Sequence, residues 1–458
     1  MNKQNMRLLN ILLVFTLLIT ACGKEDSPSN FENDSDSSNE EEVVDNEEEP
    51  GDNNQNEDNP PPNSPPGSFS LLTFENGIEN VELINPEFSW EEATDPDGDS
   101  VTYKFLFEAT NMEPTIILAE NLTQSSFLYE SILSRDTFYS WRVIASDINS
   151  ATTDSEIYNF TTRPVKVNEL VSEAEFEGRS EHTVLVFDGK LWIIGGVDRF
   201  ERSDEVWSSE DGINWTKITN NAGFESRGEH TSVVFNNRIW VVAGIDNLGN
   251  PLNDVWSSED GLNWTLENAD APFASRLDHS LTVFDNKLWL IGGEDGTFEL
   301  DDIWMSEDGV NWELITADAE FPARYGHSTI VYNDRLYLIG GLNSNQGSGF
   351  GALNDVWSSN DGINWLIETV DAEFSPRWSH STTVLNEEIW VIGGLGGGRK
   401  NDIWSSKDGI IWTQETPRDD LERFSSRFNH TSTVFNNMIF LIGGNDGSRE
   451  NDVWTIRP

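Results

Sequence analysis

The sequence predicts an all-β protein, and three observations carry this prediction. A unit of about 50 residues recurs six times from residue 164 onward, and each copy holds short apolar runs separated by turn residues. Before these units, residues 69–163 alternate apolar and polar side chains with a period of two, which is typical of half-buried strands. The 458 residues also include 18 Trp and 35 Gly, and large aromatic residues beside frequent tight turns suit short strands better than helices.

The composition excludes several classes of partner. The chain holds 81 Asp and Glu against 28 Lys and Arg, which gives a formal net charge of −53. Such a chain repels phosphate backbones and anionic lipid headgroups, so we expect neither nucleic-acid binding nor direct binding to a membrane surface. Because Cys22 is the single cysteine, an internal disulfide and a cysteine-ligated zinc site are excluded.

The first residues resemble an export signal. A basic start with Lys3 and Arg7 precedes an apolar run over 8–19, which is too short for a membrane span. Ile19-Thr20-Ala21-Cys22 resembles the bacterial lipobox, and Gly23-Lys24-Glu25-Asp26 resembles the export tag of Bacteroidota-type lipoproteins. The resemblance implies a signal peptide over 1–21, a lipid on Cys22 and display on the outer face of the outer membrane. The alternative is an ordinary signal peptide with an incidental cysteine.

Residues 22–68 are predicted to be a disordered tether. This segment consists mainly of Asp, Glu, Asn, Ser and Pro, and it has almost no apolar residues to bury. Charge repulsion and proline stiffness extend such a chain, so the tether is expected to lift the following domains away from the membrane. Apart from the lipid anchor we expect no contact with the membrane.

A first folded domain is predicted over residues 69–163. It has one Trp early and one late, in Pro86-Glu87-Phe88-Ser89-Trp90 and in Tyr139-Ser140-Trp141-Arg142-Val143. These motifs and the length resemble a fibronectin type III domain, which implies a sandwich of two antiparallel sheets.

Asp95, Asp97 and Asp99 alternate around Gly98 and are weak candidates for a calcium site. No bidentate Glu follows at EF-hand spacing, and Asp and Gly also form plain turns, so a structural turn is the favoured interpretation. No other cofactor is expected.

The repeated units begin with an arginine that is followed, three residues later, by a histidine. The pairs are Arg179 and His182, Arg227 and His230, Arg276 and His279, Arg324 and His327, Arg377 and His380, and Arg427 and His430. The histidines are 48, 49, 48, 53 and 50 residues apart. An active site needs one constellation, whereas a brace is needed in every unit, so we expect the six histidines and arginines to be structural. The guanidinium groups are expected to tie neighbouring units through carbonyls or a recurrent acid.

Each unit continues with an apolar run, a turn, a second run ending in two small residues, a loop of variable length, and an acid–apolar–Trp strand. An Asp-Gly turn such as Asp308-Gly309 and a last strand opened by Trp complete the first five units. Four strands in a unit of about 50 residues form a propeller blade, and the pattern resembles the Kelch family over residues 164–458. The resemblance implies six blades. The sixth unit lacks its last strand, and Val165–Leu170 is expected to supply it and close the ring.

Two enzymatic activities known for propellers require particular residues, and the sequence can be checked for them. A copper oxidase with a cysteine-modified tyrosine is excluded, because no cysteine remains after Cys22. A sialidase-like hydrolase would be indicated by a Phe-Arg-Ile-Pro run, and the sequence contains no such run. A secreted six-bladed Kelch protein also resembles bacterial sialic-acid epimerases, although their catalytic residues cannot be mapped. The enzymatic alternative is therefore a carbohydrate-active enzyme such as a sialic-acid epimerase or mutarotase, or a sialidase-like hydrolase, and no catalytic residue is assigned.

Binding residues are expected where the repeats differ, on the face that carries the loops after each small pair and before each arginine. Candidates in these loops are Arg199, Phe350 and Arg399. Between arginine and histidine, blades one to three carry Glu181, Glu229 and Asp278, whereas blades four to six carry Tyr325, Trp378 and Phe428. Carboxylates on one half of a funnel and aromatic rings on the other would bind a sugar-like or cationic ligand. The alternative is packing for the aromatic residues and solvated charge for the acids.

The sequence therefore predicts a lipid-anchored, monomeric binding protein of the outer membrane. Its partner would be an extracellular glycan or protein, recognised by the loop face of the propeller.

Overall fold

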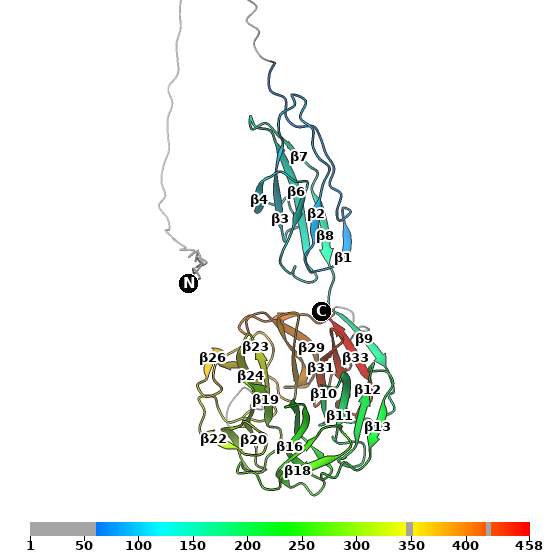
Figure 1. The fold of residues 1–458 in the computed structure, drawn as a ribbon, viewed down its shortest axis with the longest axis vertical. Helices are drawn as coiled ribbons and strands as arrows, with labels where there is room; N and C mark the ends of the chain where they lie inside the picture. Colours follow the sequence, from blue (N-terminus) through cyan, green and yellow to red (C-terminus); the bar gives the residue numbers. More distant parts are fainter. Residues whose placement is uncertain (1–60, 345–350, 418–422) are drawn as a thin grey trace, which may run out of the picture. The chain divides into compact units, whose positions relative to one another are not determined.

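The computed structural model describes residues 61–344, 351–417 and 423–458, and residues 62–458 form one compact unit. Every regular element among the described residues is a strand, so the chain is an all-β protein as the sequence predicts (Figure 1). The described part of the chain contains no helix that could span a membrane. The predicted signal peptide, Cys22 and most of the tether lie outside the described residues.

The first folded region has two sheets. A six-stranded sheet has the order β1-β8-β6-β3-β4 with β7 beside β6, β1 pairs with β8 in parallel, and β2 pairs with β5. The eight strands of the two sheets are β1 (Ile78–Val81), β2 (Glu87–Ser89), β3 (Thr102–Glu108), β4 (Ile117–Leu122), β5 (Ser126–Leu128), β6 (Phe138–Ser146), β7 (Thr152–Asp154) and β8 (Tyr158–Thr162). Between the sheets, Trp90, Phe88 and Trp141 are at most 1% exposed. The two predicted tryptophan motifs thus supply the core, whereas the fibronectin type III assignment stays a prediction.

The three aspartates proposed for calcium form a turn. The Oδ1 atom of Asp95 accepts hydrogen bonds from the backbone N–H of Asp97 at 2.8 Å and of Asp99 at 3.3 Å. No group of three or more His, Cys, Asp or Glu is arranged to hold a metal ion anywhere in the described ranges. The Asp95 carboxylate therefore acts as the acceptor of the turn, whereas the carboxylates of Asp97 and Asp99 accept from the Ser64 N–H and from the Asn149 side chain.

Six sheets follow, and each is one blade of a propeller (Figure 1). Blades one to three contain β10 (Thr183–Phe187), β11 (Lys190–Ile194), β12 (Val206–Ser209) and β13 (Thr216–Thr219); β14 (Arg227–Gly228), β15 (Thr231–Phe235), β16 (Arg238–Asp246), β17 (Pro251–Ser258) and β18 (Trp264–Asn268); and β19 (Ser280–Phe284), β20 (Lys287–Glu294), β21 (Glu299–Ser306) and β22 (Glu313–Thr316).

Blades four to six contain β23 (Ser328–Tyr332), β24 (Arg335–Leu342), β25 (Ala352–Ser359) and β26 (Leu366–Thr369); β27 (Ser381–Leu385), β28 (Glu388–Leu395), β29 (Arg399–Ser406) and β30 (Thr413–Gln414); and β31 (Thr431–Phe435), β32 (Met438–Ile442), β33 (Val453–Arg457) and β9 (Lys166–Val171). The first long strand of each blade is innermost, and each of these contacts the innermost strands of both neighbouring blades.

The ring is closed by an early segment of the chain. Strand β9 pairs antiparallel with β33, and Val167 lies opposite Ile456. Both side chains are at most 4% exposed, so the pairing is also an apolar contact. The predicted closure by Val165–Leu170 is confirmed. It gives the last blade the same four-strand order as the other blades, with β9 as its outer edge strand.

The Asp-Gly turn of each of the first five blades packs against an aromatic ring of the preceding blade. In blade three, Asp308 Oδ1 accepts hydrogen bonds from the backbone N–H of Val310 and of Asn311, both at 2.8 Å. The next residue of the turn, Gly309, has a φ of +82° and faces the ring of Trp240 in blade two, where an added Cβ atom would lie 2.4 Å from ring atoms. Only glycine permits both the conformation and the approach.

The sixth blade has no such turn, and an arginine from the first folded region takes its place. The Arg135 guanidinium carbon lies 4.7 Å from the centroid of the Trp390 ring in blade five. Arg135 also forms an ion pair with Glu388 at 2.7 Å, and both side chains are 5% exposed. A buried cation therefore covers the one ring that no glycine turn covers.

We predict that Gly309→Ala lowers the free energy of unfolding by about 2–3 kcal/mol, because the new methyl group meets the Trp240 ring in a left-handed backbone. Gly223→Ala is the matched control, since Gly223 has a φ of +91° and nothing within 4 Å of an added Cβ atom. Urea unfolding followed by tryptophan fluorescence measures both. Equal destabilisation by the two variants would contradict a packing role for Gly309.

Candidate functional site

The six histidines join neighbouring blades. Each ring Nε2 atom lies 2.8–3.2 Å from a hydroxyl oxygen in the preceding blade. His230, for example, pairs with Thr183, and His182 closes the circle with Thr431. Burial and then the neighbouring Arg227 cation lower the pKa of His230 to about 3. The imidazole is therefore neutral at physiological pH.

Each of the six arginines forms an ion pair with an acidic residue of its own blade. In blade three, the Arg276 guanidinium donates to both carboxylate oxygens of Asp302, at 2.7 and 2.8 Å, and to the carbonyl of Gly292 at 2.8 Å. Arg276 is 0% exposed and stacks over Phe273. Asp302 and Gly292 both belong to blade three, and the remaining donor, Nε, reaches only the nearby carbonyl of Ala274 at 3.0 Å, so the expectation that the guanidinium spans two blades is wrong. The arginine backbone makes the link between blades instead, because its carbonyl accepts from Gly244 of the preceding blade at 2.9 Å.

A ring of six backbone hydrogen bonds encircles the propeller axis. The residue before each histidine donates its N–H to the carbonyl of the equivalent residue in the preceding blade, over 2.7–3.1 Å. The members of this axial ring are Glu181, Glu229, Asp278, Gly326, Ser379 and Asn429. All six have a φ between +49° and +61°, which is uncommon for residues other than glycine. The closed circle of hydrogen bonds imposes this conformation in every blade.

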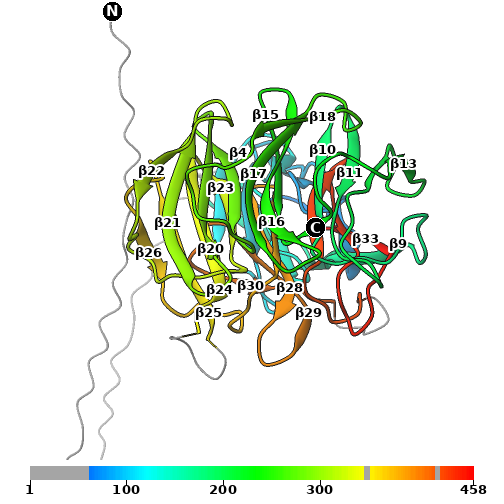
Figure 2. The same cartoon turned by 90° about the horizontal axis from the view of Figure 1, so that it is seen from below.

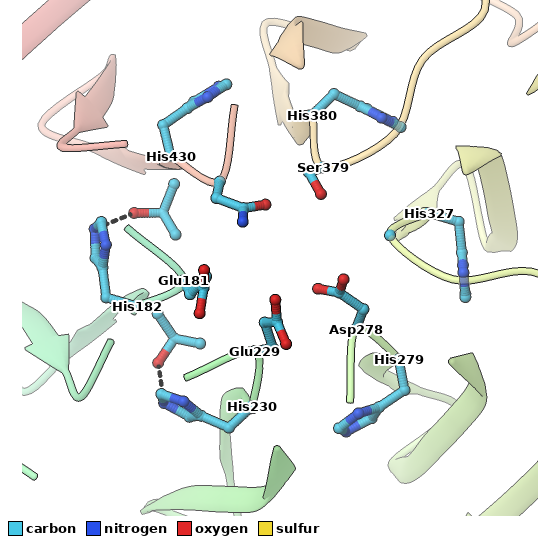
Figure 3. Close-up of a pocket in the computed structure, with 14 residues that line it drawn as sticks. Glu181, His182, Glu229, His230, Asp278, His279, His327, Ser379, His380 and His430 are labelled. Carbon is cyan, nitrogen blue, oxygen red and sulfur yellow. Dashed lines mark hydrogen bonds between the residues drawn. The ribbon is translucent and has the colours of Figure 1, made fainter. Parts of the chain in front are cut away.

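The side chains of the axial ring line a cavity of about 190 Å³ together with the six histidines. Figure 3 shows Glu181, Glu229 and Asp278 directed toward the centre of this cavity, with Ser379 on its opposite side. The three acids come from adjacent blades. The sequence placed them on one face, and the structure brings their carboxyl groups together around the axis.

The environment favours the protonated form of these acids. Burial, followed by the charges of Asp278 and Glu181, raises the pKa of Glu229 to about 10. Burial, followed by Glu181 and Glu294, raises the pKa of Asp278 to about 8. The pKa of Glu181 is also raised by burial, although Arg202 and Arg449 oppose the shift. The carboxyl groups are not simply solvated surface charges.

The three predicted aromatic residues form a continuous arc in blades four to six. The ring centroids of Tyr325 and Trp378 are 5.7 Å apart, and those of Trp378 and Phe428 are 6.2 Å apart. All three side chains are half-buried. The arc adjoins the cavity, because an added Cβ atom on Gly326 would lie 3.2 Å from the Trp378 ring. Burial, then the charges of Glu294 and Asp278, raises the pKa of Tyr325 to about 12.

The family model of the KLHDC2/KLHL20/DRC7 Kelch-repeats domain matches residues 146–341 and 278–458. Together these two matches cover more than half of the chain. The chain belongs to the Kelch-repeat family. Kelch repeats commonly mediate protein binding, which is consistent with a binding module. No curated protein sequence matches the chain.

The variable loops of the Kelch blades carry exposed arginine side chains and exposed apolar side chains. Arg199 and Arg399 are exposed as expected, and the Arg399 guanidinium lies 5.9 Å from the centroid of the Phe428 ring. Phe350 lies outside the described residues. Figure 2 shows the hairpin from β28 to β29, which carries Arg399, projecting beyond its blade.

The loops after the small pairs also expose three large apolar side chains, two of which, Leu248 and Phe298, the sequence analysis missed. Phe200, Leu248 and Phe298 are 85%, 86% and 68% exposed, and each follows the small pair of its own blade, in blades one to three. We call them the apolar rim. The signal was available in the sequence, because each is a large apolar residue among turn formers, but unequal loop lengths hide their equivalence.

Proposed function

We propose that the chain is a lipid-anchored binding module on the outer surface of a bacterial cell, and that it recognises an extracellular protein through the loop face of its propeller. One observation carries this proposal. The loop face combines the apolar rim, the aromatic arc and the acid-lined cavity. Solvent-exposed apolar side chains that gather beside polar groups typically mark protein-interaction surfaces.

The division between constant and variable positions supports recognition over catalysis. The arginine, histidine and glycine positions repeat in every blade and are used in contacts within and between blades. The side chains at the rim, the arc and the cavity differ from blade to blade. A rigid frame that presents varied loops is the usual arrangement of a recognition surface.

A glycan partner remains a second candidate, and the arc is the observation that favours it. Tyr325, Trp378 and Phe428 offer half-buried aromatic faces beside carboxyl groups. Aromatic faces stack on apolar surfaces while neighbouring carboxyl groups exchange hydrogen bonds with hydroxyls. The sandwich before the propeller and the acidic tether would then act as spacers that carry this face away from the membrane.

We predict that the triple variant Phe200→Ser, Leu248→Ser and Phe298→Ser weakens binding to protein ligands by about tenfold or more, because it removes the apolar rim. The full chain would be screened on arrays of extracellular protein domains and of glycans. Leu366→Ser is the matched control, since Leu366 is 64% exposed on the outer strand β26. Trp378→Ala tests the glycan alternative on the same arrays. A wild-type chain that captures nothing, or ligands retained by both the triple variant and Trp378→Ala, would contradict a role for this face.

The anchor has its own test. We predict that Cys22→Ser abolishes the incorporation of labelled palmitate, because the thiol is the acceptor of the lipid, and that Ser27→Ala leaves it unchanged. Protease added to intact cells is expected to remove the wild-type propeller from the cell surface. Palmitate retained by the Cys22→Ser variant, or a propeller resistant to protease on intact cells, would argue against surface display through this cysteine.

A further inference from the structure

The described residues that line the axial cavity include acceptors for a cation but no lysine or arginine. Glu181, Glu229 and Asp278 reach it from three adjacent blades. The causes that shift the pKa of Asp278 are burial and two other acids, without any basic group among them. Arg202 acts on both Glu181 and Glu229, but in each case burial outweighs its attraction. The acidic groups of the cavity are therefore not fully compensated by nearby basic groups.

Two further oxygen atoms in the cavity lack partners. Ser379 is 8% exposed, its hydroxyl is directed into the cavity opposite the acids, and within the described residues this hydroxyl has no hydrogen-bond partner (Figure 3). The Oε2 atom of Glu181 is likewise buried without a partner there. Buried polar atoms without partners are rare in native proteins, and they commonly indicate a missing ligand or water.

The size and surroundings of the cavity limit what it can hold. About 190 Å³ is below the 300–1,000 Å³ of sites that enclose a whole drug-sized ligand, so a single small group fits better than an entire sugar. The described residues show no arrangement of three metal-binding side chains, which disfavours a bare divalent ion. Trp378 and its neighbours in the arc provide an apolar surface next to the cavity.

We propose that the axial cavity binds a primary ammonium group on an apolar stem, the chemistry of a lysine side chain on a protein partner. An ammonium group has three N–H donors, and the carboxylates of Glu181, Glu229 and Asp278 supply acceptors from three sides. The methylene stem would lie along Trp378, whose aromatic face also attracts a cation. A guanidinium group is planar and prefers a bidentate carboxylate, so it matches three separate acceptors less well. This inference rests on the proposed recognition role of the loop face.

Binding of a cation must displace protons. With pKa values of about 10 for Glu229 and about 8 for Asp278, the empty cavity is largely protonated near neutral pH. An ammonium group stabilises the ionised carboxylates, so their protons are released on binding and the affinity rises with pH. The rise continues until the lysine ammonium itself begins to titrate, near its ordinary pKa of about 10.4.

The other charged or titratable groups around the acids do not reverse this direction. They are Glu294, Glu299, Tyr325, Arg202, Arg449 and the six histidines of the cavity wall. Tyr325 stays neutral because its pKa is about 12, and burial keeps histidines such as His230 neutral. Glu294 has a pKa raised by burial and then by Glu299. It can only add to the proton release.

The test is isothermal titration calorimetry of the full chain with short capped peptides that differ at one residue: lysine, Nε-acetyl-lysine, norleucine or arginine. We expect the lysine peptide to bind at least about tenfold more tightly than the other three. We also expect proton release in buffers of different ionisation heat, and an affinity that rises from about pH 6 to about pH 9. Free butylamine distinguishes a small amine from a peptide side chain as the source of the ammonium group.

Variants assign the binding to the cavity. The pair Glu229→Gln with Asp278→Asn is expected to weaken lysine-peptide binding at least about tenfold and to abolish the proton release, because neutral amides cannot ionise. Glu225→Gln is the matched control, since Glu225 lies in the same blade with an exposed side chain and is expected to change nothing. Ser379→Ala leaves every acid in place and is expected to weaken binding severalfold. Circular dichroism confirms that each variant is folded.

Equal binding of the lysine and norleucine peptides, or a double variant that binds as the wild type does, would overturn the ammonium site. The two proposals fail separately. If array ligands are captured by the wild-type chain and lost in the apolar-rim variant while lysine peptides do not bind, the recognition function stands and the ammonium site is wrong. If neither arrays nor peptides give binding, both are wrong.

Discussion

The axial ring of backbone hydrogen bonds is the constraint from which the site geometry follows. Each of its six N–H groups is satisfied by the neighbouring blade, so the ring exists only when all blades are present and the wheel is closed. This explains why a segment as early as β9 is used to complete the sixth blade. The same hydrogen bonds hold six residues at positive φ, and their side chains consequently line the cavity on the axis. Closure of the ring and formation of the cavity are thus one event.

Around this ring, repeated and unrepeated residues have different uses. Buried arginine–carboxylate pairs and neutral histidines recur in all six blades, and glycine turns recur in the first five; together they satisfy polar groups within blades and join neighbouring blades. The acids on the axis are held where burial raises their pKa, which disfavours folding at neutral pH relative to an apolar side chain. Groups held at such a cost commonly belong to functional sites. The proposed recognition surface therefore lies where the repeat pattern is broken.

The sequence predicts the repeated features well, because repetition makes a pattern visible without an alignment. Six arginine–histidine pairs indicate six blades, and the missing outer strand of the last unit points to the stretch around Val167. The acids and aromatic residues of the candidate site were also named correctly as neighbours on one face.

Other features depend on geometry that residue types do not encode. The axial ring is made of backbone atoms, and its six members are of different residue types, from glycine (Gly326) to glutamate (Glu229). No shared side chain therefore marks the ring in the sequence. The sequence shows that the sixth unit lacks an Asp-Gly turn, but only the folded structure shows that the ring left without one is Trp390 and that Arg135, far away in the chain, covers it. The guanidinium groups were expected to span two blades because neither the acid nor the carbonyl they choose can be located from spacing alone.

Amide hydrogen exchange measured residue by residue tests the axial ring most directly. If the ring holds the wheel together, the amides of Glu181, Glu229, Asp278, Gly326, Ser379 and Asn429 should exchange as slowly as those of a buried strand residue such as Val241, and only through global unfolding. Exchange of these six amides at least about a hundredfold faster than that of Val241, with the strands still protected, would show that the blades stay assembled without the ring and would contradict the account.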